Sequence, residues 1–312
     1  MKQKFGYLLP TRERVMKGQL ETAPLLALAE KAEDQGYDSI WVGDSLVARP
    51  RHDPLTTLAA IASRTQTVEL GTAVLLPALR NPVALAQTAA TVDQLSEGRL
   101  ILAVGIASDL PNVRAEFEAA GVPFEKRVGR MMEGIRLCQA LWTGDAVEWN
   151  GRWNVNCETL GILPNRPGGP PIWGVGTARG SLERAGRHLD GWLPFGPDAE
   201  TIGKCWREVQ EIASSEGRTP QELTCAAYLT VSIDENMEKA QEGLDEYLQS
   251  YYGASTDLLK SMMACFAGPL DEAGQWLQDY VDAGARHIVL RFAGDNEKHL
   301  DMFMKLRADR GW

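Results

Sequence analysis

Two kinds of hydrophobic pattern alternate along most of this chain, and residues 68–102 show both clearly. Val68, Leu70 and Ala73–Leu76 give the segment Val68–Leu76 an apolar pattern typical of a buried strand, and Arg99–Val104 is a second apolar strand. Between them apolar residues recur at helical spacing, with Asn81–Pro82 typical of a helix start and Gly98 of a helix end. Two buried strands joined by a helix predict parallel neighbours with a crossover connection.

This strand–helix unit recurs across the chain. Eight segments are predicted as strands: Lys4–Leu9, Tyr37–Gly43, Val68–Leu76, Arg99–Val104, Pro171–Gly176, Gly191–Phe195, Thr224–Ser232 and His287–Phe292. Segments with helical spacing follow most of them: Leu20–Gln35, Pro54–Arg64, Phe124–Trp142, Ser181–His188, Ala199–Glu216, Asn236–Tyr252, Thr256–Phe266, Leu270–Ala283 and His299–Arg307. Eight such units predict a single α/β domain over residues 1–312, a (β/α)8 TIM barrel, with an open doubly wound sheet as the alternative.

One segment departs from this alternation. Thr143–Gly169 contains an alternating pattern around Asn150–Gly151, a pair that favours a tight turn between two strands. We therefore predict an insertion between barrel units that carries a β-hairpin.

Composition narrows the range of partners. Hydrophobic residues make up 44% and charged residues 24% of the 312, as in an ordinary soluble globular protein. The 42 acidic residues outnumber the 32 basic ones, the net charge is −10, and no Lys/Arg-rich run occurs, so neither nucleic acid nor a membrane is an expected partner. The five cysteines are scattered without a CxxC pair, and no secretory signal is visible at the N-terminus, which indicates a reduced cytoplasmic protein without a structural metal.

Active sites of such barrels lie at the carboxyl ends of the strands, so the loops that follow the strands hold the candidate chemistry. The loop Asp44–Asp53 combines Asp44, Ser45 and His52 with two nearby arginines, a set suited to binding anions or transferring protons. Alternatively, Asp53 caps the following helix and the arginines are solvated. The candidate catalytic residues are Asp44, Ser45 and His52.

The loop Gly174–Gly180, with the sequence GVGTARG, is a candidate phosphate or flavin site. Its glycines lead into a predicted helix, whose free N–H groups and positive dipole end favour an anion. The candidate cofactor-binding residues of this loop are Gly174, Val175, Gly176 and Thr177. A plain tight turn between strand and helix would produce the same pattern. No GxGxxG follows the first strand and no Walker or GxSxG motif occurs, which argues against a Rossmann dinucleotide site, a P-loop and an α/β-hydrolase.

Six motifs follow one another along nearly the whole chain. They are GYDSIWVGDS (Gly36–Ser45), LGTAVLLPALRNPVALAQTAATVDQLSEGRLILAVG (Leu70–Gly105), EFEAAGVPFEKR (Glu116–Arg127), ALW (Ala140–Trp142), PPIWGVG (Pro170–Gly176) and DGWLP (Asp190–Pro194). In this order they resemble the bacterial luciferase-like family of flavin- and deazaflavin-dependent oxidoreductases.

The resemblance implies a TIM barrel that binds reduced FMN or the deazaflavin F420 at its top face. In the family the third strand ends in a non-prolyl cis peptide bond that supports the cofactor ring, and here that bond falls at Ala73–Val74. Family phosphate contacts fall on Gly174–Thr177, in agreement with the pattern of that loop. Further cofactor candidates are Gly105 and Ser108 after the fourth strand, and Arg291 past the last strand, which would meet an anionic tail.

One position departs from the family pattern. Luciferases proper and many deazaflavin enzymes carry a His directly after the acidic residue that ends strand two. Here that position is Ser45, after Asp44, and His52 is the candidate substitute.

Three functions are expected from these features. The first is a two-component monooxygenase, in which a separate flavin reductase supplies reduced FMN, and O2 added to its ring oxygenates a small organic substrate. The alternative is an F420-dependent dehydrogenase or reductase that moves a hydride, with Asp44, Ser45 or His52 handling the proton. The third is a non-catalytic flavin-binding protein. The acidic net charge disfavours the polyglutamate tail of F420 unless a local basic patch outweighs it, and the resemblance also implies a homo-oligomer.

Overall fold

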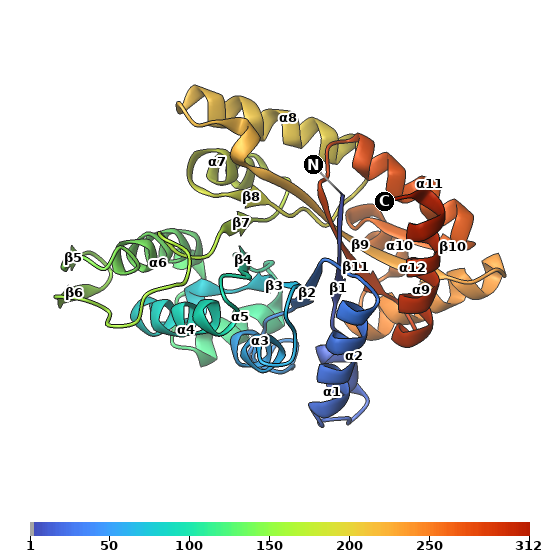
Figure 1. Cartoon of the computed structure of the whole chain (residues 1–312), viewed down its shortest axis with the longest axis horizontal. Helices are drawn as coiled ribbons and strands as arrows, with labels where there is room; N and C mark the ends of the chain where they lie inside the picture. The colour runs from blue at the N-terminus through green and yellow to red at the C-terminus, as the bar shows by residue number, and fades with distance from the viewer. Residues whose placement is uncertain (1–2) are drawn as a thin grey trace.

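The computed structural model describes residues 3–312, and its main feature is a closed ring of parallel strands (Figure 1). The ring strands are β1 (Lys4–Leu8), β2 (Ser39–Val42), β3 (Glu69–Leu75), β4 (Leu100–Val104), β7 (Ile172–Gly174), β8 (Gly191–Trp192), β9 (Thr224–Ile233) and β11 (His287–Phe292). Neighbours pair in the order β9-β11-β1-β2-β3-β4-β7-β8, and β8 pairs back to β9. This closure confirms the predicted (β/α)8 TIM barrel, and the doubly wound alternative is wrong because such a sheet has two open edges.

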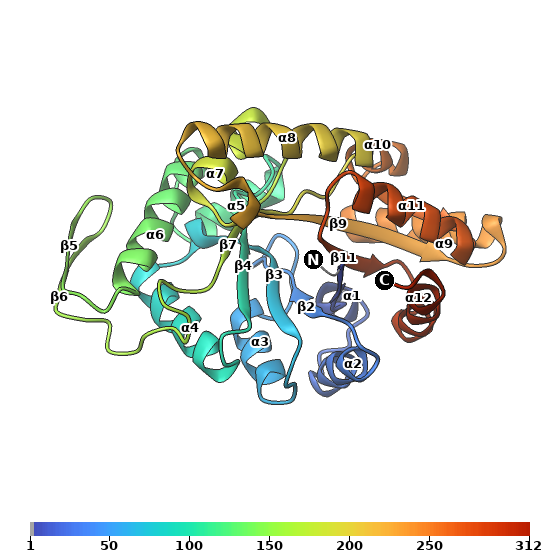
Figure 2. The same ribbon diagram turned by 45° about the horizontal axis from the view of Figure 1, so that its top comes forward.

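Helices surround the ring on its outer side (Figures 1 and 2). They are α1 (Thr11–Met16), α2 (Ala23–Asp34), α3 (Pro54–Ala62), α4 (Pro82–Leu95), α5 (Pro111–Ala119), α6 (Arg127–Leu141), α7 (Arg179–His188), α8 (Ala199–Ser215), α9 (Met237–Tyr252), α10 (Thr256–Met262), α11 (Leu270–Asp282) and α12 (Asn296–Arg310). Short 3-10 turns occur at Pro77–Leu79, Phe124–Lys126 and Pro220–Glu222. None of the helices described within residues 3–312 combines the length and the apolar content needed to span a bilayer.

Two sequence-encoded caps fix helix starts beside the barrel mouth. The side chain of Asp53 accepts a hydrogen bond from Thr56 N at 2.9 Å, which confirms its role as the cap of α3. Asn81 accepts from the N–H groups of Val83 and Ala84 at the start of α4, with Pro82 at the first helical position.

The barrel interior is filled by side chains that point inward from the strands. This inner cluster consists of Leu8, Trp41, Ala73, Ile101, Ala103, Trp173, Leu193, Ala226 and Val289. Trp41 is fully buried, and a Cβ atom on either Gly6 or Gly71 would overlap its indole. Glycine on both neighbouring strands therefore makes room for the largest side chain of the interior. A second and larger apolar core lies between the ring and the helices.

The predicted hairpin insertion is present. Strands β5 (Val147–Asn150) and β6 (Asn154–Cys157) pair in antiparallel fashion and project beyond α6 at the left of both views (Figures 1 and 2). Asn150 pairs with Asn154, so the connecting loop has three residues rather than the two of a simple Asn-Gly turn.

Three short elements differ from the sequence-based prediction. The predicted helix Thr256–Phe266 ends early, and its last residues begin strand β10 (Cys265–Gly268), which pairs with the far end of β9. Helices α1 and α5 form where no helix was predicted. Each of these elements is short, and pairing or packing against the barrel decides its conformation more than local propensity does.

Candidate functional site

The carboxyl end of β3 is irregular. The peptide bond Ala73–Val74 is cis, as predicted, and the pairing of β3 with β4 shifts register between Thr72 and Leu75. Thr72 Oγ1 donates to the Ala103 carbonyl at 2.8 Å, and Gly105 N donates to the Leu75 carbonyl at 2.9 Å. Hydrogen bonds to β4 and its loop therefore hold the irregular segment from both sides.

Three of the predicted cofactor-binding residues meet at this point. A Cβ atom on Gly105 would lie 2.7 Å from Val74 Cγ2 and 3.4 Å from Val175 Cγ2, so both side chains pack over the bare Cα of Gly105. We call Val74, Gly105 and Val175, which come from the ends of β3, β4 and β7, the apolar seat. A small apolar surface of this kind suits the face of a flat ring.

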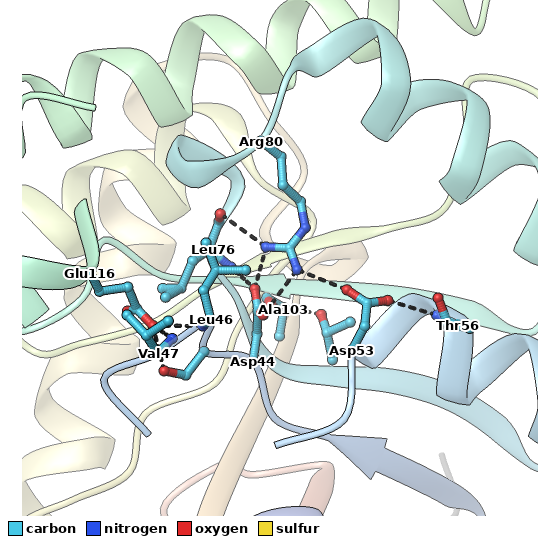
Figure 3. A network of polar contacts seen from close by, with 11 residues as sticks. Asp44, Leu46, Val47, Asp53, Thr56, Leu76, Arg80, Ala103 and Glu116 are labelled. Carbon is cyan, nitrogen blue, oxygen red and sulfur yellow. Dashed lines mark hydrogen bonds and ion pairs between the residues drawn. The ribbon is translucent and has the colours of Figure 1, made fainter. Parts of the chain in front are cut away.

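Asp44 is held by an arginine that the sequence did not single out (Figure 3). Its carboxylate is almost fully buried and forms a two-pronged ion pair with Arg80, at 2.5 and 2.9 Å, and it also accepts from Leu76 N at 2.9 Å. Arg80 reaches Asp53 as well, at 3.2 Å. Burial lowers the pKa of Arg80, but the hydrogen bonds and charge of Asp44 and Asp53 more than offset this and raise it above its ordinary value. Both oxygens of Asp44 are therefore occupied.

A separate polar network surrounds Glu116, near Leu46 and Val47 (Figure 3), and Ser45 is part of it. The buried carboxylate of Glu116 accepts from Ser45 Oγ at 2.6 Å and from the N–H groups of Leu46, Val47 and Ala48 at 2.6, 2.9 and 3.1 Å. The Ser45 hydroxyl also accepts a hydrogen bond from Arg49 N, four residues further along the loop, at 2.8 Å. The hydroxyl thus serves to shape the loop after β2.

His52 does not join Asp44 or Ser45. Its Nε2 atom donates to the carbonyl of Leu20 at 3.2 Å, in the segment between α1 and α2. The candidate catalytic residues of the sequence therefore make three separate sets of contacts rather than one constellation.

The loop between β7 and α7 has the features of an anion site. The N-cap position of α7 is Ala178, and in the described chain no side chain caps the helix there. Trp192 Nε1 donates to the Gly176 carbonyl at 2.9 Å and fixes the loop, while Thr177 is half-buried beside it. Inside the first turn, Arg184 Nη2 donates to Ser181 Oγ at 2.9 Å. The uncapped N–H groups and this guanidinium together favour a bound anion.

A small pocket connects this loop to the apolar seat. It is lined by Val104, Gly105, Ile106, Met131, Gly174, Val175, Ser181, Arg184 and Leu189. Seven of the predicted cofactor residues thus lie along one path, from Ala73 and Val74 through Gly105 to the start of α7. Ser108 is exposed, further along the loop after β4.

Arg291 lies on the opposite side of the barrel mouth. Its side chain is buried, donates to Thr230 Oγ1 at 2.7 and 3.0 Å and to Tyr252 OH at 2.7 Å, and lies 5.2–5.4 Å from the centres of four tyrosine rings. The four tyrosines are Tyr228, Tyr247, Tyr251 and Tyr252. Arg291 is therefore separate from the path that leads to α7.

The family profile described as luciferase-like monooxygenase matches residues 1–308. The chain belongs to the luciferase-like family. Its curated relatives include an F420-dependent glucose-6-phosphate dehydrogenase of Nocardia farcinica, 30% identical, with 92% of this chain and 93% of the relative covered. Solved structures confirm the TIM-barrel fold. An F420-dependent secondary alcohol dehydrogenase in complex with an F420-acetone adduct superposes with a TM-score of 0.83 at 22% identity, over 98% of each chain. The monooxygenase RslO1 from Streptomyces bottropensis gives a TM-score of 0.81 at 22% identity, also over 98% of each chain. This luciferase-like protein is thus an oxidoreductase by family.

Several polar residues of the barrel mouth escaped the sequence reasoning. Arg80 and Glu116 occur inside the family motifs, but their partners lie 36 and 71 positions away. For the tyrosines of α9, the sequence offers one pattern that could have indicated them, the aromatic-rich segment Tyr247–Tyr252 at the end of a predicted helix. Within residues 3–312 no group of three or more His, Cys, Asp or Glu side chains is arranged to hold a metal ion.

Proposed function

We propose that this protein is an F420-dependent dehydrogenase or reductase that transfers a hydride between the deazaflavin and a small organic substrate. The observation that carries the proposal is the match, at 30% identity over 92% of the chain, to a relative named as F420-dependent. Further relatives at 28–30% identity, from Amycolatopsis mediterranei and Mycolicibacterium gilvum, have the same name. The relatives therefore favour F420 over the reduced FMN of a two-component monooxygenase, the function that the sequence alone placed first.

The apolar seat fits the ring of such a cofactor. Val74 and Val175 present methyl groups over Gly105, next to the cis bond Ala73–Val74. A side chain at position 105 would occupy the same space. F420, when bound, supplies the carbon that accepts or donates the hydride. The role of the protein at this point is to hold the ring flat and to exclude water from its face.

The start of α7 fits the phosphate of the cofactor. The pocket from the apolar seat leads to Ser181 and Arg184, beneath the uncapped first turn of the helix. Burial lowers the pKa of Arg184, and the charge of Glu183 offsets this only in part. A phosphate at this position would be stabilised by the helix N–H groups and by Arg184.

A groove between α6 and α7 fits the polyglutamate tail. It is lined by Val128, Met132, Arg136, Gly180, Glu183, Arg184, Arg187 and His188, and it shares Arg184 with the phosphate pocket. Burial lowers the pKa of His188, and the positive charges of Arg136, Arg187 and Arg218 lower it further, so the groove lies in a positive field. Arg187 also pairs with Glu216 at 3.1 Å, so an incoming carboxylate would have to share the Arg187 guanidinium with Glu216. The groove is the local basic patch that outweighs the acidic net charge.

We assign Glu13 as the residue that accepts the proton of the substrate. Asp44 is bound by Arg80 and Ser45 by Glu116, and His52 contacts a backbone carbonyl through Nε2, whereas its buried Nδ1 has no hydrogen-bond partner in the described chain. Glu13, in α1, accepts from Tyr247 OH at 2.5 Å through Oε1, and in the described chain Oε2 has no hydrogen-bond partner. Oε2 is therefore free to accept the proton of a substrate hydroxyl.

The binding of three cofactors to the purified protein tests this proposal. We expect F420 to bind, followed by its own fluorescence, with an affinity about 3- to 10-fold above that of F420 without glutamates, because exposed ion pairs each contribute little. Arg136→Gln should remove part of this difference. Arg64→Gln is the matched control, since Arg64 is paired with Glu30 outside the groove. Tight binding of FMNH2 without F420 binding would restore the monooxygenase, and F420 binding without turnover of any substrate would favour a non-catalytic binding protein.

A further inference from the structure

Four arginines and four tyrosines gather at the mouth of the barrel, on the side of β1, β9 and β11. We call this group, with one glutamate, the arginine–tyrosine cluster: Arg12, Glu13, Arg49, Arg51, Tyr228, Tyr247, Tyr251, Tyr252 and Arg291. The members come from α1, from the loop after β2, from β9, from α9 and from β11. All of these segments meet at the carboxyl ends of the strands.

Arg291 forms the base of the cluster. It is 2% exposed and its hydrogen bonds go only to the neutral hydroxyls of Thr230 and Tyr252. Burying a guanidinium without a carboxylate is costly, and the surrounding tyrosine rings offset only part of that cost. The buried charge therefore produces a strong positive potential at the mouth above it.

Arg51 and Arg12 both contact Tyr251, one of the tyrosines around Arg291. Arg51 Nη2 donates to Tyr251 OH at 3.1 Å, and Arg12 lies over the same ring, 4.5 Å from its centre. Arg12 Nη1 is buried and has no hydrogen-bond partner in the described chain. Burial lowers the pKa of Arg12, and the like charges of Arg51 and Arg49 lower it further. An unpaired donor is thus held among like charges.

The charges of the cluster do not balance. Within residues 3–312, none of the four guanidinium groups forms an ion pair with a carboxylate, whereas Arg80 at the same mouth is paired with two. Glu13 is the single carboxylate of the cluster, and it accepts from Tyr247 rather than from an arginine. Four cations around one anion leave a site that an additional anion would stabilise.

The cluster adjoins the apolar seat. A Cβ atom on Gly43, at the end of β2, would overlap Arg51 Nη1 and would lie 3.4 Å from the carbonyl oxygen of Ala73. The Arg51 guanidinium and the cis bond Ala73–Val74 therefore flank the same glycine. A ligand held by Arg51 would lie beside a ring on the apolar seat, within the reach of a small molecule.

We propose that the arginine–tyrosine cluster binds the oxyanion group, a carboxylate or a phosphate, of a small anionic substrate. Arg12 and Arg51 make the direct contacts, and Arg291 supplies the field from below. The tyrosine rings hold the guanidinium planes and line an apolar wall next to them. This inference rests on the proposed function, because the hydride acceptor is a ring on the apolar seat, while the anion site itself stands on the cluster alone.

Calorimetric titration of the whole protein with matched ligand pairs tests the inference. The pairs are benzoate with benzamide, and glucose 6-phosphate with glucose. Hydrogen bonds to charged groups predict that at least one anion binds about 10- to 100-fold more tightly than its neutral counterpart. The pair that shows the difference identifies the carboxylate or the phosphate as the anion, and equal affinities within both pairs would overturn the proposal.

Two variants and one control locate the binding. Arg12→Gln and Arg51→Gln should each weaken the preferred anion about tenfold or more and leave the neutral ligand unchanged. Arg14→Gln is the control on the same helix, because Arg14 is already paired with Glu21 at 3.6 Å, and it should keep the wild-type affinity. If all three variants bind the anion as tightly as the wild type, the anion binds elsewhere and the cluster assignment is wrong.

F420 fluorescence measured on the same samples separates this inference from the proposed function. Anion preference without F420 binding would refute the cofactor assignment and support the anion site. F420 binding without anion preference would leave the cofactor assignment in place and refute the anion site.

Discussion

His287 provides a quantitative test of the barrel interior. It begins β11 at the end of the barrel opposite the mouth, fully enclosed, with Nε2 2.6 Å from Ser39 Oγ and its ring edge-on to Trp41 and Trp173. Burial, with a smaller contribution from the charge of Lys4, lowers the pKa of His287 from 6.5 to about 3. In the unfolded chain the imidazole regains its ordinary pKa, so the unfolded state binds one more proton between these two values.

The sign and size of the effect follow from this difference. A lowered folded-state pKa means that stability is fully present above pH 6.5 and is lost as the pH falls toward 3. Each pH unit inside that window costs about 1.4 kcal/mol, so His287 alone should lower the free energy of unfolding by about 2 kcal/mol between pH 7 and pH 5. A histidine with an ordinary pKa would contribute almost nothing over the same interval.

Two measurements check this value. The chain has four histidines, so the ring signals of carbon-13-labelled protein can be followed by NMR and assigned with His287→Gln. The His287 signal should keep its neutral chemical shift down to pH 5. In urea unfolding, the wild type should lose about 2 kcal/mol more than His287→Gln between pH 7 and pH 5. A His287 signal that titrates near pH 6.5, or equal losses in the two proteins, would refute the reasoning.

Three further predictions concern the barrel mouth. In Gly105→Val, the new Cβ atom would lie 2.7 Å from Val74 Cγ2, and its methyl groups would crowd the apolar seat. The F420 affinity measured by fluorescence should therefore fall more than about tenfold, with an unchanged circular dichroism spectrum. Asp44→Asn leaves the mostly buried Arg80 without its main counter-charge, so the free energy of unfolding measured in urea should fall by about 3 kcal/mol. A loss below about 0.5 kcal/mol would show that the ion pair is unimportant for stability. Glu13→Gln should lower kcat about 100-fold or more with F420 binding unchanged, and a wild-type pH–rate profile in this variant would exclude Glu13 as the proton acceptor.

The barrel itself was predictable because its signals are local and repeated. Each of the eight strands is a short apolar run bounded by turn residues, and errors in one run do not affect the others. The caps at Asp53 and Asn81 were equally visible, since a cap and its partners lie within three residues. Strand β10 was not predictable in this way, because it forms by pairing Cys265 with Thr230 of β9, and no local pattern encodes that contact.

The candidate site was predictable to a smaller extent, and for a similar reason. Positions such as Val74, Gly105 and Val175 follow strand ends, and parallel strands bring their ends to one face. The partner of a polar loop residue is set by geometry between strands. Arg80 pairs with Asp44, and Glu116 accepts a hydrogen bond from Ser45, and no local sequence pattern encodes either contact.

The acidic net charge does not by itself decide whether a polyanionic cofactor binds. A net charge of −10 over 312 residues argues against a polyanionic ligand only if the charges act together at the binding site. At physiological salt the screening length is about 8 Å, so a ligand mainly senses the groups that line its own site. Basic groups outnumber acidic ones in both proposed anion sites: Arg136, Arg184 and Arg187 against Glu183 in the groove along α7, and, at the mouth, four arginines without an ion pair among residues 3–312 against Glu13. The acidic remainder of the surface repels anions from nonspecific positions, which strengthens the preference for these two sites.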